Sequence, residues 1–204
     1  MAVRETDLLC HELLLRLAGR LPDRHLWRYR DWLAGGAAEV VARLLPGTLM
    51  RERIALDDEE HRLLSDALLP LGADPAVVNA VLPAVVDTTP HYSFTTEPPA
   101  ENVGDSAVLV LGATLRGRAG VREVRNTWRR RDSGSPKLVV LVSASDDYAE
   151  LTGEIQRVLR ALGDSAPCVE VVPKDLEPTP YHRMAIEESA LVCAGAEEFA
   201  GRRG

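Results

Sequence analysis

Lysine, cysteine and long apolar runs are scarce in this chain of 204 residues. No apolar stretch approaches the ~20 residues that a membrane-spanning helix needs, so we expect no insertion into a membrane. The three cysteines are odd in number and widely spaced, which argues against both a disulfide framework and a Cys-x-x-Cys zinc site. Lysine occurs only at Lys137 and Lys174, so nearly all basic residues are arginines, a skew that is typical of high-GC bacterial genomes.

Motifs for common catalytic and cofactor chemistry are also absent. The sequence contains no Gly-x-Ser-x-Gly nucleophile turn and no His-Glu-x-x-His zinc motif. It has no dinucleotide fingerprint, and residues 117–119 read Gly-Arg-Ala where a phosphate-binding loop needs Gly-Lys followed by Ser or Thr. We therefore expect neither a cofactor nor a metal ion, and enzyme activity receives no positive support from the sequence.

The composition is that of a folded protein with a polar surface. Hydrophobic residues make up 46% of the chain and charged residues 27%, which excludes global disorder. The net charge is −7, and the acids Glu5 and Asp7 stand where a secretion signal carries positive charge, so we expect a cytoplasmic protein. The length accommodates one large domain or two small ones.

Residues 1–86 carry the signals of a helical domain. Pro22 and Pro46 are each expected to end a helix, because proline cannot donate the backbone hydrogen bond that a continuing helix needs. Asp57 and Glu60 have the spacing of a capping box and predict the start of another helix. The whole segment is therefore expected to be all-α.

A different pattern follows this segment. Residues 87–104 contain three prolines and four threonines without a sustained period, which indicates a linker in which residues 92–95 are compatible with one edge strand. Beyond the linker we expect an α/β domain over residues 105–194 and a polar tail over residues 195–204.

Apolar runs and helical periods alternate within the expected α/β domain. Continuous apolar runs of about five residues are typical of strands that are buried on both faces. The expected order is strand, helix, strand, helix, strand, helix, over residues 107–111, 117–131, 138–142, 148–162, 168–172 and 181–193. Because such an order implies right-handed crossovers, the fold class that we expect is α/β in two parts: an all-α N-terminal domain, then a small three-layer α/β domain with a mainly parallel sheet of three or four strands.

One candidate ligand site follows from this topology. Ligands of parallel sheets bind beyond the carboxyl ends of the strands. The residues expected at that rim are Gly112, Thr114, Ser143, Asp146, Lys174 and Asp175. The alternative for Asp146 is a purely structural role at the start of a helix, where acids are stabilised by the helix dipole.

A second candidate site is a cluster of basic residues. Residues 105–137 carry eight basic and three acidic side chains, a net charge of +5, whereas residues 138–204 carry a net charge of −6. The spacing of four arginines is expected to place them on one helical face that meets an anionic partner: Arg118, Arg122, Arg125 and Arg129. We expect glutamate in all four places to remove that partner without unfolding the domain. The alternative is a solvated face, and the total charge disfavours nucleic acid as the partner.

Two further groups of residues are weaker candidates. His91, Tyr181 and His182 follow similar Thr-Pro pairs and are the candidates for acid–base chemistry, provided that the two histidines meet in space. An aromatic and arginine cluster on one short helix is the candidate for protein docking, with packing in the core as the alternative: Trp27, Arg30 and Trp32.

Taken with the absent motifs, these features favour a non-catalytic adaptor or regulatory protein that acts through contacts with a protein partner or with further copies of itself. The alternative is a sensor or enzyme that binds a nucleotide or a phosphorylated ligand at the rim of the sheet.

Overall fold

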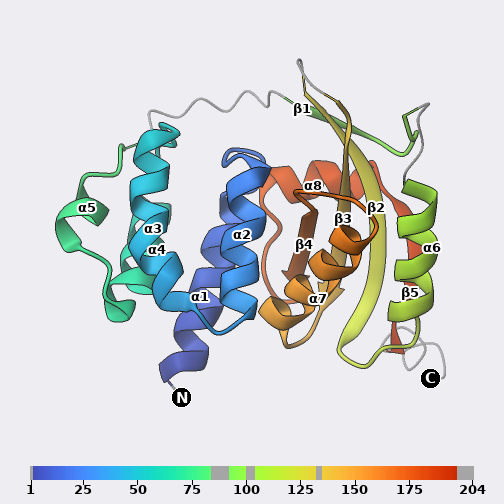
Figure 1. The fold of residues 1–204 in the computed structure, drawn as a ribbon, viewed down its shortest axis with the longest axis horizontal. Coiled ribbons are helices and arrows are strands. Elements are labelled where there is room, and N and C mark those ends of the chain that lie inside the picture. Colours follow the sequence, from blue (N-terminus) through green and yellow to red (C-terminus); the bar gives the residue numbers. More distant parts are fainter. Residues whose placement is uncertain (1, 84–91, 100–103, 132–134, 197–204) are drawn as a thin grey trace. The chain divides into compact units, whose positions relative to one another are not determined.

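The computed structural model describes residues 2–83, 92–99, 104–131 and 135–196 (Figure 1). The chain divides into two compact units, which we call the helical unit, Met1–Thr89, and the sheet unit, Pro90–Gly204. No helix in the described part of the chain is long and apolar enough to cross a membrane.

The described part of the helical unit is built from helices, as the sequence predicts. Its elements are α1 (Ala2–Arg16), α2 (Asp23–Ala34), α3 (Ala38–Arg51), α4 (Asp58–Leu68), the 3-10 helix η1 (Leu69–Leu71) and α5 (Pro75–Asn79). The capping box is confirmed, because the Asp57 carboxylate accepts the backbone N–H of Glu60 at 2.8 Å and the Glu60 carboxylate accepts that of Asp57 at 3.2 Å. The expected helix end at Pro46 is wrong: α3 continues through this buried proline, because Leu45 and Leu49 on either side of it are fully buried in the core.

The sheet unit contains a five-stranded sheet. Its elements are β1 (Tyr92–Thr95), α6 (Gly104–Leu115), β2 (Val121–Arg131), β3 (Lys137–Ala144), α7 (Tyr148–Ala161), β4 (Cys168–Pro173), α8 (Pro180–Glu187) and β5 (Ala190–Ala194). Strand β2 pairs antiparallel with β1, β3 and β5, and only β3 and β4 are parallel among the described strands. The sheet is thus mostly antiparallel, and the expectation of a mainly parallel sheet was wrong.

Two elements exchange their expected types. Residues 107–111 lie in helix α6 rather than in a strand, and residues 121–131 form strand β2 rather than part of a helix over 117–131. A short apolar run is compatible with either a buried strand or a buried helix, so the run alone did not decide. In β2 the buried Val124 and Trp128 lie on the same face of the sheet, a period of two that the arginines at helical spacing concealed.

The chain after β4 differs from the expectation in a similar way. The single helix predicted for residues 181–193 is in fact α8 followed by β5. The edge strand expected at residues 92–95 is confirmed as β1, and the strands and the helix expected between residues 138 and 172 are confirmed as β3, α7 and β4.

The two faces of the sheet have different chemistry. Helices α6 and α7 cover one face, where valines of β2, β3 and β4 form an apolar core with Leu111 and Ile155 (Figure 1). Helix α8 covers the other face, to which the alternate residues of the same strands point. Several of these residues are polar: Arg125, Thr127, Arg129, Ser143, Cys168 and Glu170. This second face carries the candidate functional groups.

Candidate functional site

A buried polar cluster lies between α8 and the sheet. Its five members are at most 3% exposed: Arg129, Cys168, Glu170, Tyr181 and His182. The His182 ring bridges two oxygens, since Nε2 is 3.1 Å from Glu170 Oε2 and Nδ1 is 2.7 Å from Thr179 Oγ1. Cys168 donates its S–H toward Glu170 Oε1 at 3.6 Å. The carboxylate of Glu170 therefore stands between the thiol and the imidazole.

The rest of the buried polar cluster is organised around Tyr181. Arg129 Nη1 donates to the Tyr181 hydroxyl at 3.0 Å, and the rings of Tyr92 and Phe94 from β1 each lie 5.2 Å from the Tyr181 ring in edge-on contact. Burial raises the pKa of Tyr181 well above its usual value, so the phenol stays neutral.

Two of the three candidates for acid–base chemistry belong to this cluster. Tyr181 and His182 are neighbours in α8, but they are packed against the sheet and offer no surface on which a substrate can bind. A catalytic acid or base must reach its substrate within hydrogen-bonding distance, so their position favours a structural role. His91 lies outside the described residues, so its expected contact with His182 is not tested by the structure.

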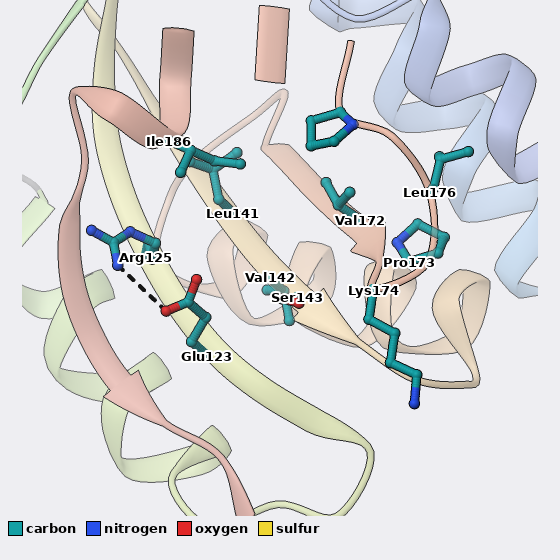
Figure 2. A pocket seen from close by; sticks show the side chains of 11 residues that line it. Glu123, Arg125, Leu141, Val142, Ser143, Val172, Pro173, Lys174, Leu176 and Ile186 are labelled. Carbon is teal, nitrogen blue, oxygen red and sulfur yellow. Dashed lines mark hydrogen bonds and ion pairs between the residues drawn. The ribbon is translucent and has the colours of Figure 1, made fainter. Parts of the chain in front are cut away.

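A hollow of about 160 Å³ opens on the same face of the sheet, at the carboxyl ends of the parallel strands β3 and β4 (Figure 2). Of the six residues expected at the rim, the hollow is lined by Ser143 and Lys174. The complete lining is Glu123, Arg125, Leu141, Val142, Ser143, Val172, Pro173, Lys174, Leu176, Pro178 and Ile186.

Four expected rim residues do not line the hollow. Gly112 and Thr114 lie in helix α6, because the segment expected to be the first strand is helical; a Cβ on Gly112 would contact Val192 of β5, and the Thr114 hydroxyl donates to the carbonyl of Val110. The Asp146 carboxylate covers the backbone of Gly120, where it leaves no room for a Cβ. Asp175 is exposed in the turn after β4.

The polar groups of the hollow are of both signs. Arg125 donates Nε to the Ser189 hydroxyl at 2.7 Å and lies 3.4 Å from Glu123 Oε2, an ion pair drawn in Figure 2. Among the described residues, neither the Lys174 ammonium group nor the Ser143 hydroxyl has a hydrogen-bond partner. Glu123 and Arg125 were not predicted as lining residues, because residues 121–131 were expected to be helical. The period of two in β2 is the signal that would have placed both side chains on one face of the sheet.

The basic residues do not form the expected helical face. Arg118 precedes β2 and pairs with Glu154 of α7 at 2.6 Å, and Arg122 is exposed. Arg125 lines the hollow, and Arg129 is buried under α8. Arg122 and Arg125 are three residues apart in β2 and therefore point to opposite faces of the sheet, so a common surface for an anionic partner does not form from all four.

The docking cluster proposed in the helical unit is partly buried. Arg30 is 2% exposed and donates to the backbone carbonyl of Leu14 at 3.3 Å, so it cannot contact a partner without a rearrangement of the core. Trp27 and Trp32 are half-buried, with Arg28 above the Trp27 ring and Tyr29 in edge-on contact with Trp32.

The three cysteines are expected to be inert toward thiol reagents in the native protein. All three are buried, and burial together with Asp7 raises the pKa of the Cys10 thiol to about 12. Roughly one Cys10 thiol in ten thousand is then ionised at pH 8, and the thiolate is the reactive form. A titration with Ellman's reagent should detect no thiol in native protein and three in denaturant; a thiol that reacts within seconds in native protein would contradict this expectation.

The described residues contain no group of three or more His, Cys, Asp and Glu side chains that could hold a metal ion. Comparisons with protein-family models, with curated proteins and with solved structures give no match for this chain.

Proposed function

We propose that this protein is a non-catalytic adaptor or regulatory protein that acts through protein–protein contacts. The observation that carries the proposal is the surface of α6. Between Ser106 and Leu115 this helix has no charged side chain, and Leu109 is 74% exposed. A helix that carries apolar side chains on its outer side as well as its inner side is normally covered, so the exposed Leu109 favours contact with another protein.

The packing of α6 sharpens this argument. Ala107, Leu111 and Leu115 face the apolar core of the sheet unit, which accounts for one side of the helix. Val108 and Val110 are half-buried, and Leu109 lies between them on the outer side. Isolated exposed leucines are normal on protein surfaces, but a run of seven residues without a polar side chain, 107–113, is unusual in a surface helix. Fully covering one leucine side chain stabilises a complex by about 1.5–3 kcal/mol.

The arrangement of the candidate catalytic groups also favours a non-catalytic role. Tyr181 and His182 are buried between α8 and the sheet, and Cys168 is buried beside them. A catalytic constellation would instead have to expose a nucleophile, acid or base to a bound substrate.

The test compares Leu109→Gln with Leu44→Gln, which changes an exposed leucine on α3 of the helical unit. Cross-linking with mass spectrometry in the producing cell identifies partners of the wild-type protein, and light scattering measures self-association. We expect Leu109→Gln to weaken the interaction with the purified partner, or with a second copy, about tenfold or more, which corresponds to ~1.4 kcal/mol. Leu44→Gln should bind like the wild type.

Two results would contradict the proposal. One is a strictly monomeric protein without a reproducible partner. The other is a partner that binds the Leu109→Gln variant and the wild type with equal affinity.

A further inference from the structure

The hollow at the carboxyl ends of β3 and β4 has the size of a small metabolite. Its volume is about 160 Å³. Pockets that enclose a nucleotide or a drug-sized ligand measure about 300–1,000 Å³. The hollow is smaller than such pockets, so it encloses a small ligand such as an amino acid more completely than a nucleotide.

Polar groups of both signs stand on one side of the hollow. Ser143 pairs with Glu123 of β2 and with Val172 of β4 in the register of the sheet, and the backbone N–H of Lys174 donates to the carbonyl of Ala144. This register places Ser143 between Glu123 and Val172, and Lys174 follows Val172 by two residues, just past the end of β4. In Figure 2 the Lys174 side chain starts beside the hollow and extends away from it, so its ammonium group has to swing inward to reach a ligand.

The Glu123 carboxylate is held in place but keeps one oxygen available. Arg125 faces Glu123 Oε2 and is itself anchored to Ser189, both to its hydroxyl and to its carbonyl at 3.3 Å. In the described structure, Glu123 Oε1 has no hydrogen-bond partner. Because Arg125 orients the carboxylate through Oε2, Oε1 can accept a hydrogen bond from a cationic group of a ligand.

Apolar side chains make up the rest of the lining. Leu141 and Val172 project from neighbouring strands, Ile186 from α8, and Leu176 and Pro178 from the loop between β4 and α8. Figure 2 shows Leu141 and Ile186 together on the side away from Lys174, with Val172 next to Pro173. An amphipathic ligand fits this division, with charged groups at one end and a short apolar body at the other.

We propose that this hollow binds a free α-amino acid with an aliphatic side chain. The carboxylate of the ligand accepts hydrogen bonds from the Lys174 ammonium group and the Ser143 hydroxyl, and its ammonium group donates to Glu123. Its side chain lies against Leu141, Val172 and Ile186. A phosphate or an organic acid has no cationic group to donate to Glu123, so the proposed ligand is a zwitterion. This binding is a property of the sheet unit and does not depend on the contacts proposed for α6.

The experiment is isothermal titration of the full chain with four probes. L-leucine should bind with a Kd of about 1 mM or tighter. Each of the other probes lacks one part of the proposed ligand: 4-methylpentanoate lacks the ammonium group, 3-methylbutylamine lacks the carboxylate, and glycine lacks the side chain. We expect each to bind at least tenfold more weakly than leucine.

Two variants assign the charges, and a third serves as the control. Lys174→Gln should weaken leucine and 4-methylpentanoate alike, whereas Glu123→Gln should weaken leucine and leave 4-methylpentanoate unchanged or tighter. Arg157→Gln removes one exposed positive charge on α7 and should bind like the wild type. Thermal unfolding of each variant confirms that the sheet unit remains folded.

Three results would overturn the proposal: no heat with leucine at 10-fold the expected Kd, 4-methylpentanoate binding as tightly as leucine, or folded Glu123→Gln and Lys174→Gln variants that bind leucine like the wild type.

Discussion

Replacing Arg129 by glutamate is expected to unfold the sheet unit, whereas the same change at Arg122 is expected to leave it folded. Arg129 is 2% exposed and donates to the Tyr181 hydroxyl, within the cluster that also holds the Glu170 carboxylate. A buried glutamate would lose this hydrogen bond and add a second negative charge, at a cost of several kcal/mol. Domains of this size are stable by only ~5–15 kcal/mol, so little stability would remain.

Arg122 is the matched control for this prediction. It lies on the same strand, carries the same charge and is exposed, so its reversal should change the free energy of unfolding by less than ~1 kcal/mol. Hydrogen exchange of the β3 and β4 amides measures the stability of the sheet unit separately from that of the helical unit. Equal protection of both variants would show that Arg129 is exposed and would restore the hypothesis of a common basic surface.

The second large effect is expected at Glu170. Its side chain is fully buried and accepts hydrogen bonds on both oxygens, from His182 and from Cys168. Glu170→Ala leaves these donors without an acceptor inside the protein, and removing one member of a buried pair typically costs about 3–5 kcal/mol. Urea unfolding followed at β4 should therefore show a much lower midpoint.

Glu154→Ala is the control for Glu170→Ala. Glu154 pairs with Arg118 on the surface of α7, and such pairs contribute about 0–1 kcal/mol. If both alanine variants lost the same small amount of stability, the buried polar cluster would not contribute substantially to the free energy of unfolding. A double-mutant cycle between Glu170→Gln and His182→Phe should further show a coupling free energy above ~1 kcal/mol, as residues in direct contact do.

Several elements of the fold follow from short-range signals. The capping box at Asp57 starts α4, and the acid-rich segment before Tyr148 precedes α7. The apolar runs at 138–142 and 168–172 lie within β3 and β4, and the threonine- and proline-rich segment contains β1. These signals act within a few residues of one another, which is why the amino-acid sequence is sufficient to predict the elements.

The sequence alone also identified part of the hollow. Ser143 and Lys174 follow from the rule that ligands bind beyond the carboxyl ends of parallel strands, and β3 and β4 are such a pair. Glu123 and Arg125 reach the hollow only because β2 pairs antiparallel with β3. The residues of either strand taken alone do not predict this pairing.

The tertiary structure decided which segments became helix and strand in 104–131, and which arginines were buried. The apolar run of α6 satisfies its backbone hydrogen bonds within itself, whereas β2 needs β1, β3 and β5 as partners, and such long-range pairing leaves no local signal. Arg122 and Arg129 are the same residue type on one strand, yet one is exposed and the other lies against Tyr181. Local composition and spacing therefore determine elements such as α4, α7, β3 and β4, whereas pairing across the sheet determines the type of α6 and β2 and which side chains face solvent or core.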